Sequence, residues 1–364
     1  MSKKSPQLRF EGFTDDWEEH KFKDILKTHS FRSYLAGVSE NGEYEVIQQG
    51  DKPIVGYSDG EPFTDYKDIT LFGDHTVSLY KPKSPFFVAT DGVKILSADN
   101  FEGDYLYTTL ERYKPEPQGY KRHFTILKNQ DVWFTENMEE QQKIGVFFKQ
   151  LDDTITLHQR KLDLLKEQKK GYLQKMFPKN GAKVPELRFA GFADDWEERK
   201  SKELCTISTG KGNTQDKVDD GAYPFYVRSA TIEKSDEYLY DQEAVLTVGD
   251  GVGTGKVYHY VNGKYNLHQR VYRMYDFKDV SAKYFYYYFS KNFYKRVMSM
   301  TAKTSVDSVR MEMIADMNIV FPSVKEQENI VELFSNLDNT IALHQRKLDL
   351  LKEQKKGFLQ KMFV

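Results

Sequence analysis

The sequence is poor in the residues on which several chemistries depend. Its single cysteine, Cys205, cannot form an internal disulfide framework or a thiolate zinc site. Its 8 histidines form no HExxH motif or other paired metal-ligand spacing, and no GxSxG motif positions a nucleophilic serine. We therefore expect no metal centre and no catalytic residue in this chain.

Long apolar runs and an excess of one charge are also missing. No stretch approaches the roughly 18 to 20 apolar residues of a membrane span, and the start MSKKSPQLRF lacks the apolar core of a signal peptide. The 53 basic and 55 acidic residues give a formal net charge of −2. We therefore expect a soluble, cytoplasmic protein without membrane contact, in which binding of nucleic acid depends on local basic patches or on a partner's charge.

What the sequence does contain is an internal duplication. The 27 residues LDDTITLHQRKLDLLKEQKKGYLQKMF, from Leu151 to Phe177, return 186 positions later, from Leu337 to Phe363, with three changes. A second repeat opens each half, as LRFEGFTDDWEE from Leu8 and as LRFAGFADDWEE 179 positions later. The segments between these borders show no comparable similarity. The chain of 364 residues is therefore expected to form two domains of roughly 150 residues each, with a shared frame and different interiors.

Each long repeat has the spacing of a coiled-coil helix. Bulky seam residues recur at intervals of four and three, and about 33 residues at 1.5 Å each give a rod of roughly 50 Å. The predicted seam residues are Phe148, Leu151, Ile155, His158, Leu162 and Leu165 in the first copy and Phe334, Leu337, Ile341, His344, Leu348 and Leu351 in the second. Because each stripe alone would expose a long apolar surface, we predict that the two helices pack on each other, antiparallel about a pseudo-twofold axis.

Polar residues interrupt each seam at two places. His158 and His344 stand where a buried polar side chain fixes the register of paired helices, although a functional pair of histidines is the alternative. Lys169 and Lys355 are expected to extend their ammonium groups outward into solvent.

The interiors have the patterns of α+β domains. Brief apolar runs broken by Gly, Pro and Asp, such as YEVIQQG and DITLFG in the first half and YPFYVRSA and AVLTVGDG in the second, predict short strands. The aromatic segments that begin at Tyr105 and Lys283 have helical spacing and are expected to lie mostly in the core. The loop GDGVGTGKV is expected to be a tight turn, because Asp250 and Val257 stand where a phosphate-binding P-loop needs Gly and Ser or Thr.

The chain resembles the DNA specificity subunit of type I restriction-modification systems over essentially its full length. The most specific match is the twice-used LDxTIxLHQRKLDLLKEQKKGxLQKMF, introduced by Glu-Gln at positions 140–141 and 326–327, and LRFxGFxxxWE is similar to the segment with which the family's domains begin. One departure precedes the first helix, where Glu136 stands in the place of Pro322. The resemblance implies target recognition domains at 1–140 and 179–325 and spacer helices at 141–178 and 326–364.

What the resemblance implies is a non-catalytic reader of double-stranded DNA. Each recognition domain contacts one half of a bipartite sequence, and the helices set the unread spacer. In the family, methyltransferase subunits, expected here in two copies and with S-adenosylmethionine bound to them, dock on this scaffold and methylate adenine, and restriction subunits join them for cleavage. The chain itself is expected to bind no cofactor. A coiled-coil adaptor that bridges two protein partners without touching DNA remains the alternative, but an adaptor for two like partners should also repeat its contact faces.

Candidate DNA contacts are side chains that can read a base or bind a phosphate. Gln pairs with adenine, Arg and Lys pair with guanine, and Thr contacts the thymine methyl group. The candidates are Gln48, Gln49, His75, Thr76, Lys94, Arg122 and His123 in the first domain and Arg228, Ser229, Lys256, Gln269, Arg270, Lys303, Thr304 and Ser305 in the second. For the neighbouring Asp74 and Asp91, the alternative is a turn in which the carboxylate accepts hydrogen bonds from backbone amides.

Overall fold

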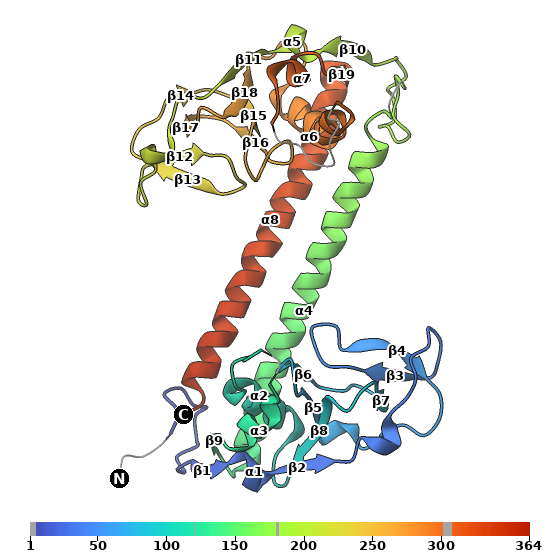
Figure 1. Cartoon of the computed structure of the whole chain (residues 1–364), viewed down its shortest axis with the longest axis vertical. Coiled ribbons are helices and arrows are strands. Elements are labelled where there is room, and N and C mark those ends of the chain that lie inside the picture. The colour runs from blue at the N-terminus through green and yellow to red at the C-terminus, as the bar shows by residue number, and fades with distance from the viewer. Residues whose placement is uncertain (1–4, 120, 180–181, 301–307) are drawn as a thin grey trace. The chain divides into compact units, whose positions relative to one another are not determined.

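The computed structural model describes residues 5–119, 121–179, 182–300 and 308–364. The chain divides into unit 1, which comprises residues 1–161 and 344–364, and unit 2, which comprises residues 162–343. Each unit therefore contains part of both long helices, α4 (Met138–Lys175) and α8 (Val324–Lys361), whose courses can be followed in Figure 1. Within the described ranges, no helix is both long enough and apolar enough to cross a membrane.

Unit 1 is built from small sheets and short helices around its parts of α4 and α8. One sheet has the order β2 (Leu26–His29), β8 (Val93–Ala98), β5 (Thr70–Gly73) and β6 (Leu79–Tyr80), with every neighbouring pair antiparallel. In another, β3 (Tyr44–Ile47) pairs antiparallel with β4 (Ile54–Ser58) and parallel with β7 (Phe86–Val88). β1 (Glu18–Lys21) pairs with β9 (Asp131–Phe134). The helices are α1 (Phe22–Ile25), α2 (Gly103–Tyr113), α3 (His123–Lys128) and the short 3-10 turns η1 (Arg32–Tyr34) and η2 (Tyr66–Asp68).

Unit 2 repeats this topology, although its interior has a different sequence. Its antiparallel sheet has the order β11 (Thr206–Thr209), β18 (Val271–Tyr275), β15 (Ala244–Val248) and β16 (Tyr258–Val261). β12 (Tyr223–Tyr226) pairs antiparallel with β13 (Ile232–Ser235) and parallel with β17 (Lys264–Leu267), which also pairs with β14 (Tyr240–Asp241). β10 (Glu197–Lys200) pairs with β19 (Asn318–Phe321). The helices are α5 (Ser201–Leu204), α6 (Ala282–Ser299), α7 (Met311–Ala315) and the 3-10 turn η3 (Thr214–Asp216).

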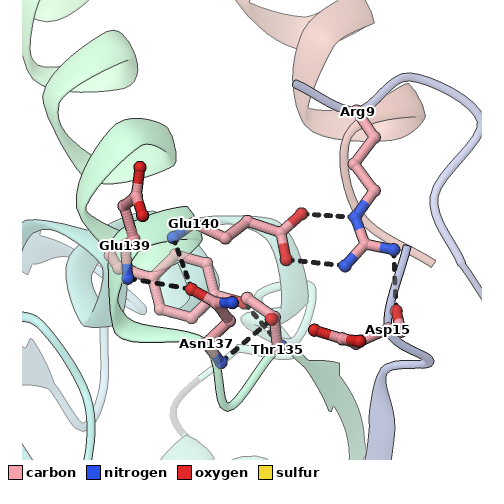
Figure 2. Close-up of polar contacts among 7 residues, drawn as sticks. Arg9, Asp15, Thr135, Asn137, Glu139 and Glu140 are labelled. Atoms are coloured by element: carbon pink, nitrogen blue, oxygen red, sulfur yellow. Dashed lines mark hydrogen bonds and ion pairs between the residues drawn. The ribbon is translucent and has the colours of Figure 1, made fainter. Parts of the chain in front are cut away.

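The repeated borders fasten each unit with the same ion pair. In unit 1 the guanidinium of Arg9 donates from Nε and Nη2 to both carboxylate oxygens of Glu140, at 2.5 and 2.8 Å (Figure 2). In unit 2 Arg188 donates the same two bonds to Glu326, at 2.7 and 2.8 Å. Both glutamates are buried. Because an unpaired buried carboxylate is costly, each pair ties the start of its unit firmly to the first turns of a long helix.

The glutamine that follows each glutamate fastens the helix to the rest of its unit. Gln141 and Gln327 each donate two hydrogen bonds from Nε2 to backbone carbonyls and accept one at Oε1 from a backbone N–H. The partners are Asn100, Thr135 and Glu102 for the first and Asp279, Pro322 and Ser281 for the second. Thr135 is thus the structural equivalent of Pro322. The turn before α4 is one residue longer than the turn before α8, and the additional residue is Glu136.

In unit 1 the two long helices pack antiparallel, which confirms the prediction from the seam. Phe147 of α4 contacts Phe358 of α8, with ring centroids 5.1 Å apart. Eleven residues further along α4, His158 faces His344, which lies earlier in α8, and their Nδ1 atoms are 3.1 Å apart. At this distance one ring donates a hydrogen bond to the other, so the histidines satisfy each other inside the interface.

Unit 2 has the same antiparallel packing. Lys169 of α4 pairs with Asp338 of α8, and Phe177, just after α4, stacks on Phe334 with ring centroids 5.8 Å apart. Among the twelve seam residues of the two units, six are buried and the others are half-buried. The buried ones are Phe148, Leu162, Leu165, Phe334, Leu348 and Leu351.

The prediction that the seam lysines extend into solvent is wrong. Lys355 Nζ lies 2.6 Å from a carboxylate oxygen of Glu111 and 2.6 Å from one of Asp152. Lys169 pairs with Asp338. Both lysine side chains are mostly buried, and an ammonium group withdrawn from water needs a charged partner, which sequence periodicity does not reveal.

The core of each unit is completed by residues from the end of a long helix. In each, a tryptophan of the opening repeat, a tyrosine of the aromatic helix and a phenylalanine of the long repeat come together. These residues are Trp17, Tyr105 and Phe363 in unit 1 and Trp196, Tyr284 and Phe177 in unit 2. The predicted core position of the aromatic helices is therefore confirmed.

Candidate nucleic-acid interface

The residues predicted to contact DNA come from corresponding connections of the two units. In unit 1 they lie after β3 (Gln48, Gln49), between β5 and β6 (His75, Thr76), at the start of β8 (Lys94) and at the start of α3 (Arg122, His123). In unit 2 they lie after β12 (Arg228, Ser229), between β15 and β16 (Lys256) and between β17 and β18 (Gln269, Arg270). Lys303, Thr304 and Ser305 lie outside the described residues. The connections that follow β3 and β12, and those between β5 and β6 and between β15 and β16, thus carry candidates in both units, although the interiors have dissimilar sequences.

Asp74 joins three of these loops in unit 1. Its backbone N–H donates to the carbonyl of Gly92 at 2.8 Å, and its backbone carbonyl accepts from the N–H of His123 at 2.8 Å. Its buried carboxylate accepts from the N–H of Phe124 at 2.9 Å and lies 3.6 Å from Lys94 Nζ. Asp74 therefore has the turn role, in which a carboxylate satisfies backbone amides.

Two candidate side chains of unit 1 are engaged inside the protein. His123 is buried, its Nδ1 donates to the carbonyl of Asp74 at 3.1 Å, and its Nε2 accepts from the N–H of Gln118 at 2.8 Å. Acceptance at Nε2 requires the neutral tautomer with the proton on Nδ1. Gln49 Oε1 accepts from the N–H of His75 at 2.9 Å. His123 therefore has no ring nitrogen left for DNA, and it supports the loops instead.

The exposed candidates of unit 1 are Thr76 and Arg122. Thr76 is followed by Val77, whose φ of 59° lies in the left-handed region that β-branched residues rarely adopt. Strained backbone of this kind occurs preferentially at functional positions. The turn that presents Thr76 thus has a backbone conformation that Val77 does not favour.

In unit 2 a carboxylate stands between two arginines. Asp250, in the β15–β16 connection, lies 3.6 Å from Arg228 Nη1 and 3.6 Å from Arg270 Nε. At this separation the groups form ion pairs without hydrogen bonds. The arginine side chains are 50% and 65% exposed, so their N–H donors remain able to bind phosphate oxygens or a guanine edge.

The other candidates of unit 2 surround this cluster. Lys256 is exposed, with Nζ 5.1 Å from the ring centroid of Tyr294. Gln269 is exposed, and its Nε2 donates to Asn213 Oδ1 at 3.0 Å. The adjacent His268 is buried, and burial, followed by the charge of Arg228, lowers its pKa. His268 is therefore neutral at pH 7 and adds no charge to this surface.

Sequence reasoning overlooked several residues that the structure brings forward. Asp250 and Val252 were treated only as parts of a turn, although Val252 is 97% exposed. In the sequence, Val252 is a single apolar residue between Gly251 and Gly253. This arrangement does not match the periodic apolar pattern of a core strand or helix. Arg9 and its counterpart in unit 2 were also not singled out, and their signal was the repetition of Leu-Arg-Phe together with Glu-Gln.

Both long helices expose leucines at repeated positions. Leu157 of α4 and Leu343 of α8 are 67% and 66% exposed, and Leu164 and Leu350, also 186 positions apart, are exposed as well. A single exposed leucine is ordinary. The same two leucines are exposed in both copies of the repeat, and the described residues do not cover them.

Reactive side chains in the described part of the chain are few. No group of three or more His, Cys, Asp or Glu side chains that could hold a metal occurs within the described ranges. Cys205 is buried, and burial raises the pKa of its thiol to about 12. A thiol of this kind is inert as a nucleophile, because the thiolate is the reactive form.

Comparison with known sequences finds one family. The type I restriction modification DNA specificity domain matches this chain twice, over residues 14–167 and 193–353. The type I restriction enzyme EcoDI specificity subunit of Escherichia coli is 26% identical over 166 residues, which are 46% of this chain and 36% of that protein. The type I restriction enzyme MjaVIII specificity subunit of Methanocaldococcus jannaschii is 22% identical over 394 positions, covering 95% of this chain and 91% of that protein.

Comparison with solved structures concerns the fold. The crystal structure of the type-I restriction-modification system S subunit from M. genitalium superposes with a TM-score of 0.76 over 99% of both chains, at 13% sequence identity. The arrangement of strands and long helices described above is therefore one that a solved structure also has.

Proposed function

Since the chain belongs to the family of type I restriction-modification DNA specificity proteins, we propose that it reads a bipartite double-stranded DNA sequence, one half with each unit. The observation that supports this most strongly is the placement of the candidate contacts. Two interiors of unlike sequence share one topology and carry cations, amides and hydroxyls on the same connections. A shared frame with different loops suits two different half-sites.

The proposed base contacts are the exposed side chains of these loops. Arg122 and Thr76 serve in unit 1, and Arg228, Gln269 and Arg270 serve in unit 2, because arginine binds guanine and glutamine binds adenine through paired hydrogen bonds. The remaining candidates are proposed to contact phosphates or neighbouring bases, and they are Gln48, Gln49, His75, Lys94, Ser229 and Lys256, together with Lys303, Thr304 and Ser305, which lie outside the described residues.

The chain is proposed to supply recognition and no catalysis of its own. Methyltransferase subunits, in two copies, dock on the long helices and bind S-adenosylmethionine, and restriction subunits complete a complex that acts on DNA in the cytoplasm. The exposed leucines at repeated positions of α4 and α8 support two equivalent docking sites. The near-neutral charge of the chain fits this dependence, because phosphate contacts dominate affinity for nucleic acid and partner subunits can provide them.

Selection from a randomised DNA library tests the proposal. The purified chain is combined with its methyltransferase, bound duplexes are sequenced, and a motif of two separated halves is expected. Arg122→Ala and Arg228→Ala should each relax one half only, at a cost of about 1 to 3 kcal/mol. Arg32→Ala, which replaces an exposed arginine outside the segments that carry the candidates, is the matched control and should change neither half. Absence of any enriched split motif would favour the protein-bridging adaptor instead.

The proposed spacer role of the helices has its own test. One additional heptad in both α4 and α8 adds about 10 Å, which corresponds to roughly three base pairs at 3.4 Å each. The selected motif should keep both halves and gain about three unread base pairs. A motif with altered halves would contradict this role for the helices.

A further inference from the structure

Val252 projects from unit 2 without a structural reason in the described part of the chain. It is 97% exposed in the connection between β15 and β16, and it contributes nothing to the core of its unit. Isolated exposed apolar residues are common on protein surfaces. The turn that carries Val252 and the charges around that turn nevertheless indicate a ligand.

The turn holds Val252 outward in a defined conformation. The N–H of Gly253 donates to the carbonyl of Arg228 at 3.3 Å, which ties the turn to the β12–β13 connection. Thr254 donates from its N–H and from Oγ1 to the carbonyl of Gly251, at 3.2 and 2.6 Å. Gly251 has a φ of 94°, which favours glycine. Because the turn is already ordered, little conformational entropy would be lost when Val252 contacts a ligand.

The surroundings of Val252 are cationic. Asp250, two residues before it, has Arg228 and Arg270 on either side at 3.6 Å. Lys256, four residues after it, is exposed in the same connection. The three connections after β12, between β15 and β16 and between β17 and β18 together carry three cations and one carboxylate, and this excess of positive charge complements a polyanion. The feature to be explained is thus an apolar tip on a surface suited to nucleic acid.

We propose that Val252 reads the 5-methyl group of a thymine in the major groove of the half-site bound by unit 2. The 5-methyl group is the apolar feature that thymine presents in that groove, where apolar side chains contact it, while the flanking arginines are suited to guanine edges or phosphates. This inference rests on the proposed function, to which it adds a specificity-determining residue and the chemical group that it recognises.

Replacement of thymine by deoxyuridine removes the methyl group and nothing else. The complex of this chain with its methyltransferase is bound to duplexes that carry the selected motif, in which each thymine is replaced singly by deoxyuridine. At one position the replacement should lower affinity about threefold to tenfold, as expected for losing one buried methyl contact. Val252→Ala should lower affinity for the thymine duplex by a similar factor and abolish the difference between the two duplexes.

A matched control uses another exposed valine of unit 2. Val218 precedes β12, whereas Arg228 follows it, so Val218→Ala alters a valine at the other end of that strand. This variant should keep the full difference between thymine and uracil. Both changes are at exposed side chains, and unchanged unfolding curves will show that unit 2 remains folded.

Several results would overturn the inference while leaving the proposed function intact. They are a half-site of unit 2 without thymine, sequence-specific binding that tolerates uracil everywhere, and Val252→Ala binding thymine and uracil duplexes with the same difference as the unchanged protein. Equal weakening of all duplexes by Val252→Ala, without a uracil effect, would indicate insertion between base pairs instead. Loss of all sequence preference in the unchanged complex would tell against the proposed function itself.

Discussion

Asp74 and Asp250 belong to corresponding connections of the two units, yet they have opposite roles. Asp74 is buried and accepts a hydrogen bond from the backbone of the segment that carries Arg122. Asp250 is partly exposed and stands between Arg228 and Arg270. One connection thus uses its carboxylate to hold loops together, and the other uses it to position cations. The shared frame therefore tolerates different chemistry in its loops, because contacts outside these loops also stabilise it.

The repeated borders contribute to that stability, because they make the same buried ion pair in both units. We therefore expect Arg9→Ala and Arg188→Ala to have equal and large effects, each lowering the free energy of unfolding of its own unit by about 3 to 5 kcal/mol, because a buried glutamate is left without its partner. Urea unfolding followed by hydrogen exchange, which separates the units, measures this. A difference of more than about 2 kcal/mol between the two variants would show that the frames are not equivalent.

The contrast between the two aspartates predicts unequal effects. Asp74→Ala should destabilise unit 1 by about 1 to 3 kcal/mol, because the partly buried N–H of Phe124 loses its acceptor. Asp250→Ala should change the stability of unit 2 by less than about 0.5 kcal/mol. It should instead strengthen binding to non-specific DNA, since Arg228 and Arg270 lose their neutralising charge. Equal unfolding curves for the two variants would remove the distinction between the connections.

Lys355 has two carboxylate partners and Lys169 has one. Replacing them should therefore change the stability of the two units by different amounts, although the difference should be smaller than that between the two aspartates. Lys355→Met should cost unit 1 about 1 to 2 kcal/mol, because Glu111 and Asp152 lose a shared cation, whereas Lys169→Met should cost unit 2 about 0.5 to 1 kcal/mol. Burial already raises the pKa of Asp152, against the opposing effect of Lys355.

The same pair of variants has a defined pH dependence. Without Lys355, the folded state should hold the proton on Asp152 more tightly than the unfolded chain does. The free energy of unfolding should then fall as pH rises from the pKa of Asp152 in the unfolded chain to its raised pKa in the folded state. The cost of Lys355→Met should therefore be greater at pH 8 than at pH 4, as measured by unfolding at both values. A cost that is the same at both values would show that Asp152 does not depend on Lys355.

The smallest expected effect concerns Lys291 of α6, whose pKa is lowered to about 8, mainly by burial and then by Lys179. Because the unfolded chain holds this proton more tightly, stability of unit 2 should rise as pH increases from about 8 to 10. Solvent screening keeps the rise below about 1 kcal/mol. Unfolding of unit 2 at several pH values measures it. Lys291→Met should abolish the rise, and persistence of the rise in that variant would assign it to another group.

Local patterns in the sequence were sufficient to predict the helices and their pairing. The recurrence of bulky residues at intervals of four and three reports one face of a helix, and two copies of the same stripe need a common partner. The antiparallel packing within each unit followed from that argument. The loops that carry the candidate contacts were also recognisable, because Gly, Asp and polar residues interrupt the apolar runs around them.

Which residues meet was decided only by the tertiary structure. Arg9 and Glu140 are 131 positions apart, and no local pattern pairs them. The common topology of the two interiors depends on strand pairing between distant segments. Two unlike sequences can therefore share it without any similarity that sequence comparison would detect. His123, Lys355 and Val252 differ in exposure for the same reason, since burial depends on what packs against a side chain. Local sequence patterns are enough to fix the repeated helices and to identify the family, whereas burial in the folded chain fixes which polar groups face inward.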